Sequence, residues 1–176
     1  MVVSVGVAGI LSVIDFTGLH SADPMARKQA VMVAESLLEE VEAQAFTICD
    51  PDDANASTAT APPNPADPAT RCVGTYQSVL GPTPGESRSS TTTPFDNVGD
   101  YDGFGMNNGI TTVMGAPMPQ LAGYNAQVTV ANAAGPGTEF PSLPAGSALS
   151  ITVKVDGAAS ASLTGYRFRY DPTASP

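Results

Sequence analysis

The first 14 residues, MVVSVGVAGILSVI, are almost entirely apolar and carry no charge. A helix needs about 20 such residues to cross the hydrocarbon core of a bilayer, so Met1–Ile14 is too short by itself. The run also lacks the basic flank and the small-residue cleavage site of a secretory signal peptide. We therefore expect the remaining part of a hydrophobic helix, with a charged leader and further apolar residues upstream. A short buried core helix is the alternative.

Apolar positions recurring every three or four residues predict a second, amphipathic helix over Pro24–Phe46. Asp23 or Ser21 caps its start, and Pro51 stops it, so the helix should end within Phe46–Asp50. The predicted packing face consists of Val31, Ala34, Leu38, Val41 and Ala45. The opposite face carries Arg27, Lys28, Glu35, Glu39 and Glu42.

The order of charges on this helix opposes the helix macrodipole, because the cations come first and the anions last. Three explanations are open. The helix continues upstream, or the face is simply solvated, or Arg27 and Lys28 pair with glutamates of a neighbouring copy displaced by about 11 residues, roughly 17 Å.

Strand-like alternation appears only in the last third of the chain. Tyr124–Ala131, Ala148–Val155 and Ser160–Tyr170 each alternate between apolar and polar residues and are rich in Val, Ile, Thr or Tyr. The dipeptide Asp156-Gly157 is a strong hairpin signal between the last two segments. These features predict an antiparallel meander with its apolar side against the amphipathic helix, and Ile110–Met114 is a candidate for a further short strand.

The segments between helix and strands are predicted to be loops. Asn55–Thr70 has four prolines and no large apolar residue, and Gly81–Thr93 is also rich in turn residues. The following segment, PFDNVGDYDGFG, is expected to be irregular and held on the head by its apolar side chains, Phe95, Val98, Tyr101 and Phe104.

Composition and charge narrow the class of protein. A chain of 176 residues fits one domain, and its 17 glycines and 16 prolines favour short strands joined by many turns. The net charge of −10 argues against nucleic acid as a partner, since phosphate binding needs a basic patch. Seven acidic residues fall between Glu35 and Asp53, so the negative charge is concentrated near the junction of helix and head.

The two cysteines, Cys49 and Cys72, are too far apart for a CxxC redox or zinc motif. A structural disulfide in an oxidising, extracytoplasmic compartment is the better interpretation, and it would stabilise the fold by roughly 3 kcal/mol. Two separately buried thiols are the alternative.

No catalytic constellation is found, and we expect neither enzymatic activity nor a cofactor. The single histidine, His20, lies in the N-terminal stem, far from any site on the head. Two acidic clusters could offer oxygen ligands to calcium, although Asx turns and caps are the more common use of such residues. These clusters are Asp50, Asp52, Asp53 and Asn55, and Asp96, Asn97, Asp100 and Asp102.

Four segments, in this order, resemble minor pilins of the mannose-sensitive haemagglutinin (MSHA) type within the type IV pilin superfamily: RKQAVMVAESLLEEVEAQAF, CDPDDAN, PFDNVGDYDGF and LTGYRFRY. The resemblance implies an α+β pilin-like fold, in which a long N-terminal helix packs on a C-terminal antiparallel sheet. Residues 1–23 would then be a truncated hydrophobic stem, and residues 24–176 a globular head that includes the amphipathic helix 24–47.

The resemblance also implies a function without catalytic residues. Such subunits are inserted in the bacterial inner membrane before assembly, then join other pilin subunits through their N-terminal helices and place their heads outward on a periplasmic or extracellular pilus. Pilus assembly or adhesion is the expected role, with any surface or carbohydrate ligand unknown. The alternatives are a pseudopilin of a type II secretion system and a secreted carbohydrate-binding or adhesive β domain.

Overall fold

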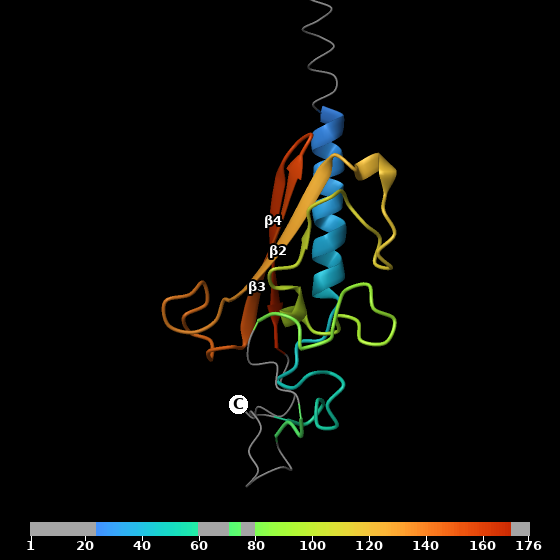
Figure 1. Ribbon diagram of the computed structural model, residues 1–176. Helices are drawn as coiled ribbons and strands as arrows, with labels where there is room; N and C mark the ends of the chain where they lie inside the picture. The colour runs from blue at the N-terminus through green and yellow to red at the C-terminus, as the bar shows by residue number, and fades with distance from the viewer. Residues whose placement is uncertain (1–23, 60–70, 75–79, 170–176) are drawn as a thin grey trace, which may run out of the picture.

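The computed structural model describes residues 24–59, 71–74 and 80–169. Within this part of the chain the fold is α+β, with one helix over residues 24–42 lying against a four-stranded antiparallel sheet (Figure 1). The strands lie in chain order: β1 (Gly105–Met106), β2 (Tyr124–Asn132), β3 (Ala148–Gly157) and β4 (Ala161–Phe168). The predicted stem, residues 1–23, lies outside the described residues.

The helix ends at residue 42, so the prediction that it continues to Phe46–Asp50 is wrong. Ala45 instead forms a parallel bridge with Asn97. The Ala45 N–H donates to the carbonyl of Asp96 at 3.3 Å, and the Val98 N–H donates to the carbonyl of Ala45 at 2.9 Å. The backbone N–H and carbonyl of Ala45, which a further helical turn would use, are therefore hydrogen-bonded to the chain at the start of the 3-10 helix η2 (Val98–Tyr101).

The helix buries a stripe of four side chains against the sheet: Ala30, Ala34, Leu37 and Val41. Of the predicted packing face, Ala34 and Val41 are fully buried, and Leu38 packs partly buried against the same core. Val31 is half-buried, and Ala45 lies beyond the end of the helix. The buried stripe is thus displaced from the predicted one toward Ala30 and Leu37.

The sheet has one buried and one exposed face, because its strands alternate as the sequence predicts. In β2, Ala126, Val128 and Val130 are buried while Gln127 and Thr129 are exposed. From β3, Ile151, Val153 and Val155 complete the core beneath the helix. The three predicted strands are confirmed to within a few residues at their ends, and so is their meander order.

The fourth strand is not the one predicted. Ile110–Met114 forms no strand, and β1 lies earlier in the chain and pairs with β2 through Gly105↔Gln127 and Met106↔Ala126. Thr111 makes only an isolated bridge with Pro117, because the chain turns back between them.

The predicted β3–β4 hairpin is confirmed, but Asp156 and Gly157 are the last residues of β3, and the turn follows them at residues 158–160. Val155 pairs with Ala161, and Gly157 adopts φ +146°, a conformation that L side chains rarely adopt. A Cβ atom at Gly157 would also overlap the carbonyl of Gly123 and approach Tyr124 Cα to 2.9 Å. Glycine is therefore required at this end of β3 for both conformation and space.

Candidate functional site

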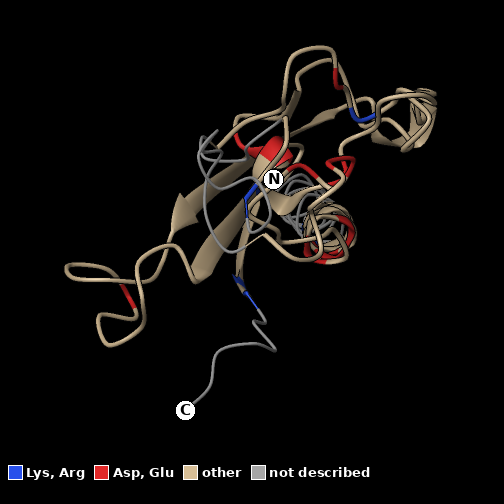
Figure 2. Ribbon diagram, turned by 90° about the horizontal axis from the view of Figure 1, so that it is seen from below, with Lys and Arg blue, Asp and Glu red and all other residues tan. Residues whose placement is uncertain are grey.

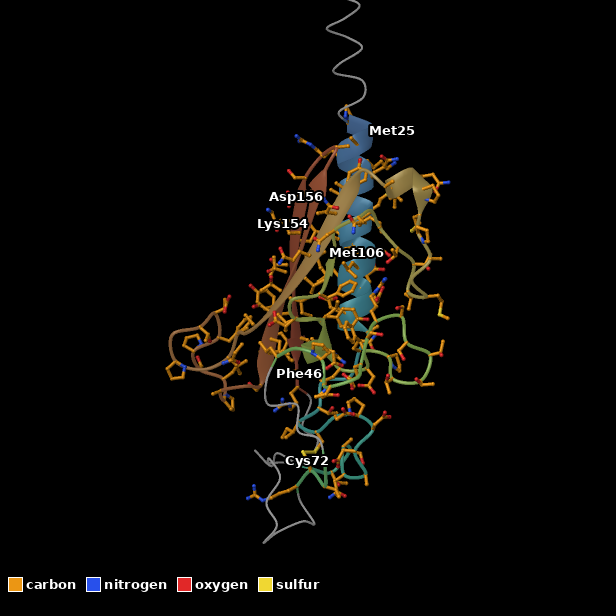
Figure 3. The ribbon with its side chains drawn as sticks, viewed as in Figure 1. Met25, Phe46, Cys72, Met106, Lys154 and Asp156 are labelled. Atoms are coloured by element: carbon orange, nitrogen blue, oxygen red, sulfur yellow. A yellow bond between two sulfur atoms is a disulfide. The ribbon has the colours of Figure 1, made fainter. Side chains whose placement is uncertain are left out.

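The predicted disulfide joins Cys49 and Cys72 just beyond the end of the helix (Figure 3). Both cysteines are buried, and their Cα atoms lie 5.4 Å apart. Further hydrogen bonds connect the two sides of the loop. Asn55 Nδ2 donates to the carbonyl of Arg71 at 2.7 Å, and Gly74 N–H donates to Asp53 Oδ2 at 2.7 Å. The disulfide and these hydrogen bonds therefore hold the two sides of the loop together at the base of the head.

A groove of about 320 Å³ lies between the helix and the loop over residues 106–121. Figure 1 shows that this loop passes along the side of the helix away from strands β3 and β4. The groove wall is mainly apolar, with Met32, Val33 and Leu37 from the helix and Met106, Val113 and Met118 from the loop. Leu37 and Met106 also belong to the core between helix and sheet, so the groove lies at the edge of that core.

Among the described residues that line the groove, only Glu40 and Arg88 are charged, and they form an ion pair with each other. Arg88 Nε lies 2.6 Å from Glu40 Oε1, and Arg88 Nη2 lies 2.7 Å from Glu40 Oε2. Arg88 Nη1 also donates to the carbonyl of Thr112 at 2.9 Å. The pair therefore joins the helix to the loop and leaves the groove without an uncompensated charge.

Tyr101 completes this polar network. Its hydroxyl donates to Glu40 Oε1 at 2.8 Å, and burial, together with the hydrogen bond to Glu40, raises the pKa of Tyr101 above its usual range. The phenol therefore stays neutral and remains a hydrogen-bond donor. Its ring belongs to an edge-to-face cluster with Phe95 and Phe104, with centroids 5.0 to 6.0 Å apart. The prediction that these aromatic residues hold the irregular segment on the head is confirmed.

The rim of the groove exposes large apolar side chains. Met32 is 58% exposed, Val113 51% and Met114 68%. Met25, two helical turns before Met32, is also exposed and extends the apolar surface toward residue 24 (Figure 3). Three of the six methionines of the chain, Met32, Met106 and Met118, line the groove, and Met114 follows the lining residue Val113 in the sequence.

The two acidic clusters predicted from the sequence meet in space. Asp50, Asp52 and Asp96 each bring a carboxylate oxygen within 4.8 Å of the others, and so do Glu86, Asp96 and Asp100. Figure 2 looks from this end and shows acidic positions on the loops and the short helix around the end of the long helix. Glu86 was not predicted as a member of this group, because it lies 36 residues after Asp50, and the turn-rich chain between them shows no periodic pattern.

Several oxygens of these clusters accept hydrogen bonds in turns and caps. Asp50 Oδ1 accepts from Asp52 N–H at 2.8 Å, and Asp100 Oδ2 accepts from Asn97 N–H at 2.7 Å. Asp102 belongs to neither triad, and its Oδ1 accepts from Val130 N–H at 2.9 Å. The hydrogen bonds therefore favour the structural interpretation of the clusters, and we assign no metal to them.

Asp96 is the most perturbed carboxyl of the group. Burial, followed by the charges of Asp50, Asp100, Glu86 and Asp52, raises the pKa of Asp96 to about 7. Its Oδ1 atom is buried and has no hydrogen-bond partner among the described residues. Asp96 therefore carries a proton more readily than an ordinary aspartate.

Comparison of the chain with protein-family models, curated proteins and solved structures found no match. Among the described residues, no helix combines the length and the apolar character needed to span a bilayer.

The groove was not predicted from the sequence. Its helix wall follows from the amphipathic pattern, but the loop wall comes from residues about 70 to 90 positions later, in a segment without periodicity. The available signal was the grouping of Met106, Met114 and Met118, since methionine is frequent at adaptable binding surfaces.

Proposed function

We propose that this chain is a structural minor pilin subunit of a bacterial type IV pilus, similar to the MSHA type. It is inserted in the inner membrane before assembly and then joins other subunits through its N-terminal helix, with the head outward. The observation that carries the proposal is a helix laid along an antiparallel meander, with the apolar run Met1–Ile14 preceding that helix in the sequence.

Two further features support this proposal. The disulfide Cys49–Cys72 fits a head that works in an oxidising compartment. The apolar residues of Met1–Ile14 gain free energy when they leave water or lipid for contact with other subunits, while the head keeps its own core under the sheet. Assembly and folding thus use different apolar surfaces.

The test places the full chain, with an epitope tag in the exposed loop 136–139, in a bacterium that assembles pili of this type. We expect the tag in sheared filaments by immunogold labelling. Val7→Glu should abolish incorporation, because a charge in the apolar run opposes insertion and packing. Thr129→Glu, on the exposed face of the sheet, is the matched control and should incorporate normally.

The pilin function would be contradicted if the tagged chain is absent from filaments. It would also be contradicted if Val7→Glu leaves incorporation unchanged. A pseudopilin would support protein secretion without appearing on extended surface filaments. A secreted carbohydrate-binding domain would instead be recovered in the medium and retained on a glycan array, with Met1–Ile14 required for folding of the head.

A further inference from the structure

We propose that the groove between the helix (residues 24–42) and the loop (residues 106–121) binds the apolar segment Met1–Ile14 of a second copy of this chain. The inference rests on the proposed function, because it names the contact through which one subunit would hold the next.

The chemistry of the groove selects an uncharged occupant. Its wall is mainly apolar, and its two charges, Glu40 and Arg88, are already paired at 2.6 Å. A charged side chain that entered the groove would lose hydration without finding a free counter-ion there. An apolar segment would remove water from the exposed rim, including Met32 and Val113, at no such cost.

The chain itself contains a segment of this kind. Met1–Ile14 has no charged residue, and the first charge of the sequence is Asp15. Small residues within it, Gly6, Ala8 and Gly9, would let its backbone approach a groove wall closely. The groove extends along the helix from Gln29 to Glu40, about 17 Å, and the predicted helix over Met1–Ile14 is about 21 Å long.

The contact would be head-to-tail. The segment that inserts and the groove that receives it are different surfaces of the chain, so each copy can give one and accept the other. A heterologous contact of this type produces a ring if the rotation closes and an open filament if it does not. It therefore suits a subunit that adds to the end of a polymer.

The test incorporates the photo-crosslinker p-benzoylphenylalanine in place of Val113 in the full chain, in cells that assemble filaments. Val113 is 51% exposed on the rim, so the replacement leaves the core intact. We expect a light-dependent dimer whose crosslinked peptide, by mass spectrometry, belongs to residues 1–14 of the other copy. Mixed cells, in which only the second copy is isotope-labelled, separate crosslinks between copies from those within one. The crosslinker at Thr129, on the opposite surface, should give no such dimer.

A crosslink within one copy, a crosslink from groove to groove, or the absence of a dimer would each overturn the inference. Met32→Glu, in the chain that carries the crosslinker at position 113, should reduce the dimer yield at least tenfold. Val113→Glu, in the chain without the crosslinker, should reduce entry into filaments, and both variants should leave thermal unfolding of the head unchanged. If these variants enter filaments like the wild type while Val7→Glu does not, the groove contact is wrong and the proposed pilin function stands. If the chain enters no filament at all, the pilin function itself fails.

Discussion

Arg88 and Glu40, 48 residues apart in the sequence, meet in a two-pronged ion pair with N–O distances of 2.6 and 2.7 Å. Their side chains are only 8% and 17% exposed. The pair connects the loop that follows the disulfide to the last turn of the helix. Because both charges are largely removed from water, each needs the opposite charge of its partner to compensate for the lost hydration.

Arg88→Met should lower the free energy of unfolding by about 3 kcal/mol, because it leaves Glu40 buried without its cation. Chemical denaturation at pH 7 measures the loss. The double variant Arg88→Met/Glu40→Gln should regain part of it, since no uncompensated charge remains. Lys154→Met is the control, because the Lys154–Asp156 pair is exposed, and its effect should stay within about 0.5 kcal/mol. Equal losses in Arg88→Met and Lys154→Met would contradict the assigned role.

Breaking the disulfide should destabilise the head by roughly 3 kcal/mol, because it closes the loop between Cys49 and Cys72, which are 23 positions apart in the sequence. Thermal unfolding of Cys72→Ser, and of the wild type with and without reductant, measures this effect. Reductant should leave Cys72→Ser unchanged, which makes that variant its own control. If the unfolding temperature of the wild type is the same with and without reductant, the disulfide does not stabilise the head.

Gly157→Ala should cost at least about 1–3 kcal/mol, because φ +146° and the backbone of Gly123 and Tyr124 both exclude a Cβ atom. Gly123→Ala is the matched control, since nothing lies within 4 Å of the Cβ position there, and its effect should be near 0.5 kcal/mol or less. Denaturant titrations compare the two variants. The hairpin geometry is wrong if both alanines are tolerated equally.

Asp96 should make the head less stable as the pH rises. The pKa of Asp96 is about 7 in the folded protein, above its ordinary value of 3.8. The protonated carboxyl therefore contributes to the stability of the fold, and this contribution is fully present below pH 3.8. This contribution is lost as the pH rises through about 7. Asp96→Asn should therefore gain stability relative to the wild type between pH 5 and pH 8.

The measurement is denaturant unfolding across that range in a buffer with a chelator, so that bound cations do not mask the carboxyl charges. Asp156→Asn, at an exposed carboxyl, serves as the control and should keep a constant difference from the wild type. A constant difference for Asp96→Asn as well would show that burial does not perturb Asp96.

Local patterns predicted those parts of the fold that depend on neighbours in the sequence. The alternation in Ala148–Val155 identified β3, and Asp156-Gly157 identified the turn after it. Both signals lie within a few residues and reflect one buried sheet face and one tight turn. The cysteine pair was predicted as well, because the sequence offers only one partner for each cysteine.

Features that depend on distant contacts were missed. The helix ends early because Ala45 pairs with Asn97, 52 residues later. Helical periodicity likewise identifies an apolar side but not its centre, which the sheet places near Ala30 and Leu37. The loop wall of the groove depends on Arg88, whose partner on the helix is not evident from sequence spacing.

The methionines around the groove also give the head a chemically vulnerable surface. An oxidant converts the thioether of an exposed methionine into a polar sulfoxide. Met25, Met32 and Met114 are exposed, whereas Met106 is buried. Mild oxidation would therefore make the groove rim polar while sparing the core under the sheet, and reductase repair of the sulfoxides would reverse the change.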